Sequence, residues 1–420
     1  MTRSHKLFRG VAKGIGALTV ACALLLAPSA ANATDWLVEN TNDSGPDSLR
    51  QAIGNANGNS GPDRIALFPT GTLTLASPLP TITDDVEILA AGGFIVDGAD
   101  LYRPFTINAG KTVSMSGFTV TNGLCNQACG SVGGGIYNDG TLTLTDVDLS
   151  GNTASGSGGT DPLALAGGIF NSGTLSLVQT TVTGNTAQTT GYTNQGNPSG
   201  GGIYNAGTLT VDRSTIDSNT ATATGGQFTN VHGGGIFNQK NLTITRSTVS
   251  NNAASGTGAS TQNSAYGAAI ANTNDPVNVH VSIDRATVGG NTATVDSPEG
   301  GEIGGVEAYG ATFAITSSTL AHNNGANLSV GTTVDVKNTI ISDPAGGGLT
   351  CLGSVSSQGY NLSSDSGCGF SGPQDQVDTN PMLAATLAAN GGPTKTYALL
   401  SGSPAIDQGK SSTGETVDQR

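Results

Sequence analysis

Apolar residues alternate with threonine, serine and aspartate over much of this 420-residue chain. In the stretch 141–152 the apolar positions are Leu142, Leu144, Val147 and Leu149, with one change of phase in the middle. A period of two is typical of a β-strand that buries one face, and threonine, valine and isoleucine favour strands. The pattern therefore predicts short strands joined by a bend.

The same pattern recurs at a fixed spacing. Four copies are plain: GGGIYNDGTLTLTDVDLSGNTA from Gly133, AGGIFNSGTLSLVQTTVTGNTA from Ala166, GGGIYNAGTLTVDRSTIDSNTA from Gly200 and GGGIFNQKNLTITRSTVSNNAA from Gly233. A fifth, eroded copy begins at Gly267 and a sixth ends at Asn324. The isoleucine that opens each copy recurs every 33 or 34 residues, at 136, 169, 203, 236 and 270. A period of this length indicates a repeat architecture.

Each unit predicts three short strands, GIYN, TLTLT and VDLSGN, followed by a loop of varying content. No helical crossover separates them, so each strand is expected to lie parallel to its counterpart in the next unit. We predict an all-β fold, a right-handed parallel β-helix of the pectin-lyase-like type, with coils stacked about 4.8 Å apart. An antiparallel sandwich or a propeller is the alternative, but hairpin signals such as Asn-Gly do not stand between the strands.

Stacked coils would place equivalent residues in columns. One apolar column inside the coil comprises Leu144, Leu177, Val211, Ile244, Ile283 and Ile315, and a second comprises Leu149, Val182, Ile216, Val249, Val288 and Leu320. A column of amides at a bend comprises Asn152, Asn185, Asn219, Asn252, Asn291 and Asn323. We expect these amides to hydrogen-bond along the stack, with glycines supplying the positive φ of tight corners.

The two ends of the chain differ from the repeats. Residues 1–33 combine a basic start, an apolar run and the small residues ANA, the pattern of a secretory signal peptide. A retained anchor is the alternative, but the run is short for a bilayer. The β-helix is expected over 34–370, with its coils clearest at 133–324. A short helix in SGPDSLRQAIGNAN, with Asp47 as N-cap, is expected to cover its first coil. Residues 371–420, rich in Pro, Gly and Ala, are expected to form a compact cover or an anchor-associated segment.

The net charge and the cysteine content bear on which partners and cofactors the protein can bind. The predicted signal carries four cations and no acids, so the exported chain has a net charge of −14 − 4 = −18. Few cations argue against a nucleic-acid partner. Without Cys22 four cysteines remain, and an even count in an exported chain favours disulfides, with local pairs Cys125–Cys129 and Cys351–Cys368. Zinc is the alternative, but histidine is scarce. We predict no cofactor; calcium is only weakly supported, because no aspartate-rich binding loop is present.

The stretch NDSGPDSLRQAI, the GGGIYN…GN-T-A coils and the tail NGGPTKTYALLSGSPAIDQG together resemble secreted bacterial right-handed β-helix proteins with a C-terminal choice-of-anchor Q domain. The coils are also similar to the repeats of chlamydial polymorphic outer-membrane proteins, which are adhesins and autotransporters. The resemblance spans nearly the whole exported chain and implies architecture and an extracellular or surface location. It implies no particular activity. No sorting motif, transmembrane helix or outer-membrane barrel follows the tail, so the mode of attachment is left open.

Pectate lyases and polygalacturonases share this fold class, but a fold alone does not imply their chemistry. One column could supply a lyase site: Asp146, Gln179, Arg213, Arg246, Arg285 and Ser317, with Asp212 and Asp284 beside it and Asp148 and Asp217 one or two residues further on. A lyase would use Arg213 or Arg246 as base, with the acids near a metal. The interpretation we favour is that both arginines are exposed and pair with Asp217 and Asp148.

Three other features of the sequence bear on function. His232–Gly233 is superficially like a polygalacturonase motif, but the companion motifs are missing and we interpret His232 as a loop residue. Tyr137, Phe170, Tyr204 and Phe237 each follow a buried isoleucine, so alternation turns them outward, where they could stack on sugar rings. Stacking on one another beneath the long loops is the alternative, and the one we favour.

A flat face of hydroxyl side chains is formed by Thr141, Thr174 and Thr208, with Thr143, Ser176, Thr210 and Thr243. Such a face could bind ice, but we interpret it as ordinary solvated strand surface.

The sequence therefore predicts a secreted or cell-surface, adhesin-like binding or structural protein. Variable loops such as SGSGGTDPLAL and TTGYTNQGNPS, together with the ladder faces, would contact an extracellular glycan or a host or cell-surface component. A polysaccharide lyase or related carbohydrate-active enzyme is the alternative. No convergent set of carboxylates or histidines is visible in the columns, so we favour binding without catalysis.

Overall fold

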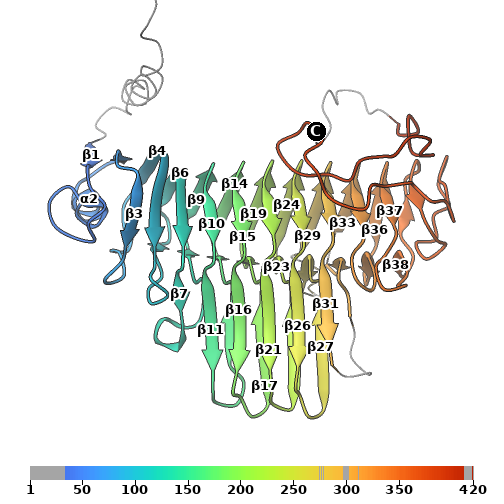
Figure 1. Cartoon of the computed structure of the whole chain (residues 1–420), viewed down its shortest axis with the longest axis horizontal. Coiled ribbons are helices and arrows are strands. Elements are labelled where there is room, and N and C mark those ends of the chain that lie inside the picture. The colour runs from blue at the N-terminus through green and yellow to red at the C-terminus, as the bar shows by residue number, and fades with distance from the viewer. Residues whose placement is uncertain are drawn as a thin grey trace, which may run out of the picture.

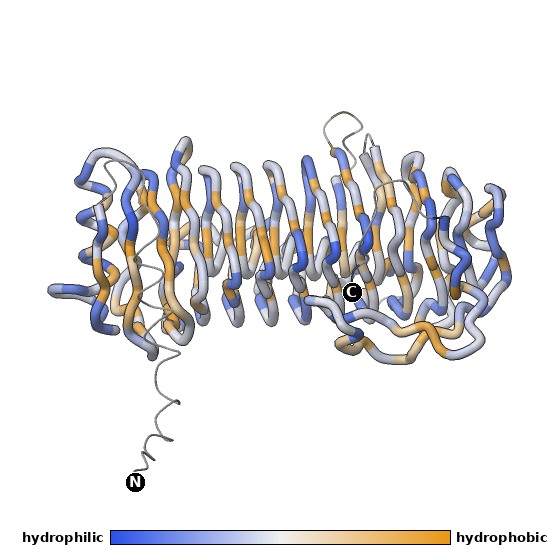
Figure 2. Tube along the Cα trace, turned by 90° about the horizontal axis from the view of Figure 1, so that it is seen from above, coloured by the Kyte–Doolittle hydropathy of each residue, from blue (hydrophilic) through white to orange (hydrophobic). Residues whose placement is uncertain are grey.

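The structure is a computed structural model that describes residues 34–273, 275, 277, 279–296, 302–310, 312–410 and 419. The predicted signal peptide lies outside the described residues. Within them the chain forms an all-β stack of parallel strands, the arrangement of a parallel β-helix (Figure 1). Apolar positions recur at the same place on successive coils (Figure 2). One sequence repeat of 33 or 34 residues thus forms one coil of the structure, as predicted.

The strands form four sheets, here called A to D. Sheet B contains β5 (Phe105–Ile107), β8 (Ile136–Asn138), β13 (Ile169–Asn171), β18 (Ile203–Asn205), β23 (Ile236–Asn238), β28 (Ile270–Asn272), β32 (Val306–Ala308), β35 (Leu328–Val330) and β38 (Cys351–Leu352). Sheet C contains β7 (Leu124–Cys125), β11 (Thr153–Ser157), β16 (Thr186–Thr190), β21 (Thr220–Thr224), β26 (Ala253–Thr257) and β31 (Thr292–Val295). Sheet D contains β12 (Leu163–Leu165), β17 (Gln195–Ser199), β22 (Phe228–His232) and β27 (Gln262–Tyr266).

Sheet A takes two strands from most coils. Its first row is β9 (Thr141–Thr145), β14 (Thr174–Val178), β19 (Thr208–Asp212), β24 (Asn241–Thr245), β29 (His280–Asp284), β33 (Thr312–Thr316), β36 (Val334–Lys337) and β39 (Ser356–Ser357). Its second row is β10 (Asp148–Ser150), β15 (Thr181–Thr183), β20 (Thr215–Asp217), β25 (Thr248–Ser250), β30 (Thr287–Gly289), β34 (Thr319–Ala321), β37 (Ile340–Ser342) and β40 (Leu362–Ser363). The first coils add β1 (Asp35–Val38), β2 (Asp63–Leu67), β3 (Gly71–Thr74), β4 (Val86–Asp97) and β6 (Thr112–Thr121).

Both predicted apolar columns are confirmed. Leu144, Leu177 and Val211 are register partners on successive coils, and the column continues to Ile244, Ile283 and Ile315. The second column follows the same rule from Leu149 to Leu320. Every member of the two columns is fully buried. Side chains of medium size are enough to fill the interior of the coil, because each one stacks directly on its counterpart in the previous coil.

The predicted asparagine column is a continuous hydrogen-bonded ladder. From Asn152 to Asn323, each side-chain Nδ2 donates to Oδ1 of the asparagine in the next coil, at 2.8–2.9 Å. A second ladder was not predicted: it runs through Asn138, Asn171, Asn205, Asn238 and Asn272 at 2.7–3.0 Å. Buried amides are tolerated when their polar atoms are paired in this way.

Sheets C and D form a two-layered projection, here called the wing, below the body of the β-helix (Figure 1). Its thin interior is built from small residues such as Ala154, Ala164 and Ala187, all fully buried. The stretches SGSGGTDPLAL and TTGYTNQGNPS, expected to be variable loops, instead contribute β11, β12, β16 and β17. The loop prediction was wrong because alternating alanine, glycine and threonine carries no large apolar residue to indicate a buried strand face.

The wing rejoins sheet B through the glycine run that opens each repeat. At Gly201, a Cβ atom would lie 2.4 Å from the carbonyl oxygen of Gly234 in the next coil. A side chain at this position would therefore push neighbouring coils apart. The GGG sequence is thus needed because the backbones of neighbouring coils lie very close together at this point.

A helix, α2 (Leu49–Gly58), packs against β1 and β2 through Leu49, Ala52 and Ile53. Its N-cap is Ser48 and not Asp47 as predicted. Ser48 Oγ accepts from the N–H of Gln51 at 3.3 Å, and the N–H of Asp47 donates to Gln51 Oε1 at 2.9 Å. Serine followed three residues later by glutamine is a capping signature, so Ser48 was the better choice.

After the last coil the chain turns back along sheet A. Gln376 still pairs with this coil, donating its N–H to the carbonyl of Asn361 at 2.8 Å. Residues 379–410, here called the strap, then run along the outside of the β-helix (Figure 1). Leu383 and Tyr397 of the strap pack against Ala321 of β34. Residues 371–420 were predicted to form a compact cover or an anchor-associated segment; their described part includes the strap, which lies along a side of the coil stack.

Candidate functional site

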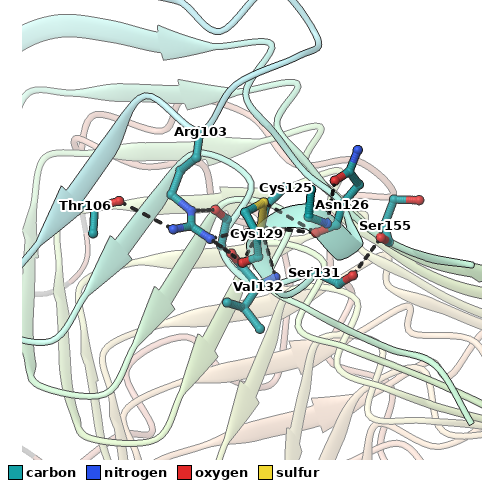
Figure 3. The surroundings of a disulfide bond; sticks show 10 residues. Arg103, Thr106, Cys125, Asn126, Cys129, Ser131, Val132 and Ser155 are labelled. Atoms are coloured by element: carbon teal, nitrogen blue, oxygen red, sulfur yellow. Dashed lines mark hydrogen bonds between the residues drawn. A yellow bond between two sulfur atoms is a disulfide. The ribbon is translucent and has the colours of Figure 1, made fainter. Parts of the chain in front are cut away.

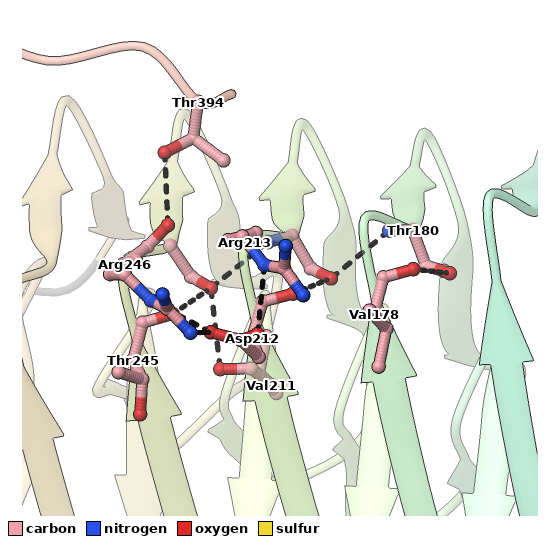
Figure 4. A network of polar contacts seen from close by, with 10 residues as sticks. Val178, Thr180, Val211, Asp212, Arg213, Thr245, Arg246 and Thr394 are labelled. Carbon is pink, nitrogen blue, oxygen red and sulfur yellow. Dashed lines mark hydrogen bonds and ion pairs between the residues drawn. The ribbon is translucent and has the colours of Figure 1, made fainter. Parts of the chain in front are cut away.

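The arginine column occupies the corners between the two rows of sheet A. Its six members adopt a left-handed φ of 49–53°: Asp146, Gln179, Arg213, Arg246, Arg285 and Ser317. Such a corner breaks strand alternation, so Arg213 and the preceding Asp212 point toward each other. Arg213 Nε donates to Asp212 Oδ2 at 2.9 Å, and Arg246 of the next coil approaches Oδ1 at 2.6 Å (Figure 4). One carboxylate is therefore shared by two guanidinium groups.

This arrangement corrects the predicted pairing with Asp148 and Asp217. Asp217 instead accepts from Ser250 Oγ at 2.6 Å and Asn251 Nδ2 at 2.8 Å. Asp148 is exposed and two coils from Asp217, in another column. The structure thus brings Asp212 to the two arginines but does not assemble the five lyase candidates.

The same geometry weighs against a lyase mechanism. Arg213 and Arg246 both direct their guanidinium groups at the carboxylate of Asp212, and neither is paired with Asp148 or Asp217. In the described part of the chain, no group of three or more His, Cys, Asp or Glu residues could hold a metal ion. The lyase alternative therefore gains no support from these residues.

The aromatic column stacks on itself. Ring centroids are 5.2 Å apart from Tyr137 to Phe170 and from Phe170 to Tyr204, and 5.0 Å from Tyr204 to Phe237. Tyr204 and Phe237 are each only 8 % exposed. Burial raises the pKa of Tyr204 to about 12. The favoured alternative, self-stacking, is confirmed; ligand binding by these rings stays a prediction, and their faces are already occupied by one another.

Arg103 covers the first ring of this column. Its guanidinium carbon lies 5.2 Å from the ring centroid of Tyr137. The same group donates to the carbonyls of Gly133 at 2.8 Å and Val132 at 2.7 Å (Figure 3). Burial lowers the pKa of Arg103. Arg103 thus ties the column to the loop that carries the first disulfide.

Both predicted disulfides are present, Cys125–Cys129 and Cys351–Cys368. Cys125 lies in β7, the first strand of sheet C, and Cys129 in the 3₁₀ turn η1 (Gln127–Cys129). The second disulfide is buried in the last coils. Disulfides form and persist in oxidising compartments, which fits an extracellular location.

His232 lies at the far end of the aromatic column. It is the last residue of β22 in sheet D, so its interpretation as a loop residue was wrong. Its ring centroid is 5.7 Å from Phe237 and 5.6 Å from Tyr266. Its Nδ1 is 3.8 Å from Oε2 of Glu307, whose side chain is only 9 % exposed. Sequence reasoning missed Glu307 because it falls in an eroded repeat, although it continues the aromatic column through Ala271.

The wing presents two outer faces of different chemistry. The outer face of sheet D, here called the amide face, displays Leu163, Gln195, Asn197, Phe228, Asn230 and Gln262, with His232 and Tyr266 at its inner border. The outer face of sheet C, here called the hydroxyl face, displays Thr153, Ser155, Ser157, Thr186, Gln188, Thr190, Thr220, Thr222, Thr224, Ala253, Ser255, Thr257, Thr292 and Thr294. Neither face was predicted, although the alternation TATAT at 220–224 was a usable signal.

Comparison of the chain with protein-family models, with curated proteins and with solved structures found no match. No helix in the described part of the chain combines the length and the apolar character needed to cross a membrane.

Proposed function

We propose that this protein is an exported binding protein that holds a neutral glycan against the amide face of its wing. The proposal includes the finer features inferred from sequence: a right-handed, pectin-lyase-like coil, an N-terminal cap formed by α2, and a C-terminal segment related to choice-of-anchor Q domains. The similarity of the coils to polymorphic outer-membrane repeats fits an adhesin-like role at a cell surface.

The observation that carries the proposal is the exposure of Phe228 among side-chain amides. Phe228 is partly exposed and belongs to none of the buried apolar clusters. Asn197 lies one coil before Asn230 on the same outer face, and Gln195 is the register partner of Phe228. A planar amide offers both a donor and an acceptor, which suits neighbouring sugar hydroxyls. An aromatic ring offers an apolar surface for the C–H face of a sugar.

Charge favours a neutral ligand over an anionic one. The chain carries 30 acidic against 16 basic residues, so its overall field repels polyanions. The amide face itself displays no carboxylate and no Lys or Arg in its strands β17, β22 and β27. Hydrogen bonding and stacking, not ion pairing, would therefore select the ligand.

A glycan array probed with the exported chain tests this function. The variant Phe228→Ala/Asn230→Ala is expected to bind its best neutral glycan at least about tenfold more weakly, since each lost contact is worth about 1 kcal/mol. Thr222→Ala, on the opposite face of the same wing, is the matched control and should bind within about twofold of the parent.

The competing outcomes are distinct. Equal losses in both variants, or no neutral glycan bound by the parent chain, would contradict binding at the amide face. Release of unsaturated sugar product in the presence of calcium, abolished by Arg213→Ala, would instead establish the lyase alternative.

A further inference from the structure

We propose that the hydroxyl face of sheet C binds ice. This inference concerns the opposite side of the wing and does not rest on the proposed glycan binding.

The hydroxyl face is a two-dimensional array. Three columns run along it without a register shift: Thr153–Thr186–Thr220–Ala253–Thr292, Ser155–Gln188–Thr222–Ser255–Thr294 and Ser157–Thr190–Thr224–Thr257. Neighbouring strands of a sheet lie about 4.8 Å apart, and alternate residues of one strand lie about 6.7 Å apart. Both repeats are close to lattice repeats of hexagonal ice, so several rows of side chains can meet ordered water positions together.

The chemistry of the array is uniform and uncharged. Twelve of its fourteen side chains are threonine or serine, the exceptions being Gln188 and Ala253. No Asp, Glu, Lys or Arg lies among these fourteen positions. Asp296, which directly follows β31 at the edge of the array, is the first charged residue beyond them. A threonine offers a hydroxyl that bonds to water and a methyl group that fits between water positions. Water in register with this array would therefore be held in an ice-like arrangement.

The array is also flat and rigidly supported. A buried layer of alanines lies behind it, comprising Ala154, Ala187, Ala221, Ala254 and Ala293. Sheets normally twist by 20–25° per strand, whereas the strands of sheet C, such as β11, β16, β21 and β26, lie side by side in nearly the same direction in Figure 1. At the first edge, Gln127 of the disulfide-closed turn donates to the carbonyl of Ser157. A flat lattice partner can therefore touch several coils simultaneously.

Other partners fit this face less well. A crystalline polysaccharide would be expected to meet aromatic rings, and none stands in the array. An ionic partner would need charge. The threonine face of sheet A, identified in the sequence, is less regular, since its columns continue into Asn241 and His280 and into Ala314 and Asp335. Sheet C therefore carries the inference.

Thermal hysteresis and ice-recrystallisation assays on the exported chain test it. The parent is expected to shape ice crystals and to separate melting from freezing temperatures. Thr222→Lys, at the centre of the array, should reduce the hysteresis to a tenth or less. Thr210→Lys on sheet A should leave it unchanged, as should Phe228→Ala on the amide face.

A folding defect is distinguished by circular dichroism and by a second variant, Thr224→Lys, in the exposed outer column. Loss of hysteresis in both sheet C variants with an unchanged melting temperature supports the proposal. No hysteresis in the parent at millimolar concentration, or full hysteresis in folded Thr222→Lys, overturns it. Because glycan binding is read out separately, failure of one proposal leaves the other standing.

Discussion

The hydroxyl of Thr394 donates to the backbone carbonyl of Arg246 at 3.2 Å, although 148 residues separate them. Next to it, Thr248 Oγ1 donates to the carbonyl of Lys395 at 2.6 Å. The strap is therefore fastened to the middle coils through the backbone, beside the corner where Arg246 meets Asp212 (Figure 4). Because the acceptor at Arg246 is a backbone carbonyl, the hydrogen bond from Thr394 does not depend on the side chain at position 246.

Tyr397 is the main apolar attachment of the strap. Its ring packs edge-on against His322 with centroids 4.8 Å apart, and burial raises its pKa to about 12. Tyr397→Ala should remove about 3 kcal/mol of local stability, as for other large buried rings. We expect limited proteolysis within 379–410 to become at least tenfold faster, while the core coils stay intact. Gly289→Ala should act similarly, because a Cβ there would lie 2.5 Å from the Tyr397 ring. An unchanged cleavage rate in both variants would contradict this attachment.

The asparagine ladder predicts a large penalty for removing one rung. Asn219 accepts from Asn185 and donates to Asn252, both at 2.9 Å. Asn219→Leu would leave the buried N–H of Asn185 without its acceptor, at about 1–3 kcal/mol. It would also remove the side-chain bonds to Asn185 Nδ2 and Asn252 Oδ1, at about 1 kcal/mol each. The free energy of unfolding should fall by at least about 3 kcal/mol in urea denaturation. Asn230→Leu, a partly exposed amide on the wing, is the control and should change it by less than about 1 kcal/mol.

The shared carboxylate of Asp212 predicts a small, salt-sensitive effect. Arg213 and Arg246 retain 39 % and 31 % side-chain exposure, so solvent screens both ion pairs. Asp212→Asn should lower the free energy of unfolding by about 0.5–1 kcal/mol at low salt. The difference should shrink at molar salt, where the screening length is about 3 Å. A loss above about 3 kcal/mol that persists in salt would show that the network does more than pair exposed charges.

Asp365 predicts a dependence of stability on pH. Burial acts to raise the pKa of Asp365, but hydrogen bonds from the Thr350 hydroxyl, the Thr350 N–H and the Gly367 N–H outweigh it and lower the pKa. A carboxyl group with a depressed folded-state pKa stabilises the fold above its unfolded pKa of about 3.9 and loses this contribution as pH falls through the folded value. Asp365→Asn should therefore be less stable than the parent at pH 7. The two proteins should converge as the pH falls through the folded-state pKa of Asp365, in urea denaturation followed across pH. A gap that is constant from pH 7 to pH 2 would refute this linkage.

The coil body could be predicted because its signals are large and local. Leu144 and its counterparts alternate with polar residues in every copy, so the period fixes both strand and column. The wing could not be predicted from the sequence, because Ala154 and Ala187 fill its buried strand faces without the large apolar side chains that indicate a core. The pairing of Arg213 with Asp212 depended on a left-handed corner, and non-glycine residues seldom adopt that conformation. The place of Glu307 in the aromatic column could not be predicted, because the spacing between its repeat and the preceding one departs from 33–34 residues.

The two asparagine ladders give the stack a direction. Each amide nitrogen points to the following coil, and the second ladder ends when Asn272 donates to the backbone carbonyl of Glu307 at 2.7 Å. A chain emerging amino end first would always expose the same amide donor on its newest coil. That donor meets the Oδ1 acceptor of the following asparagine in one register only, so winding can proceed stepwise from the first coil, each finished turn acting as the template for the next.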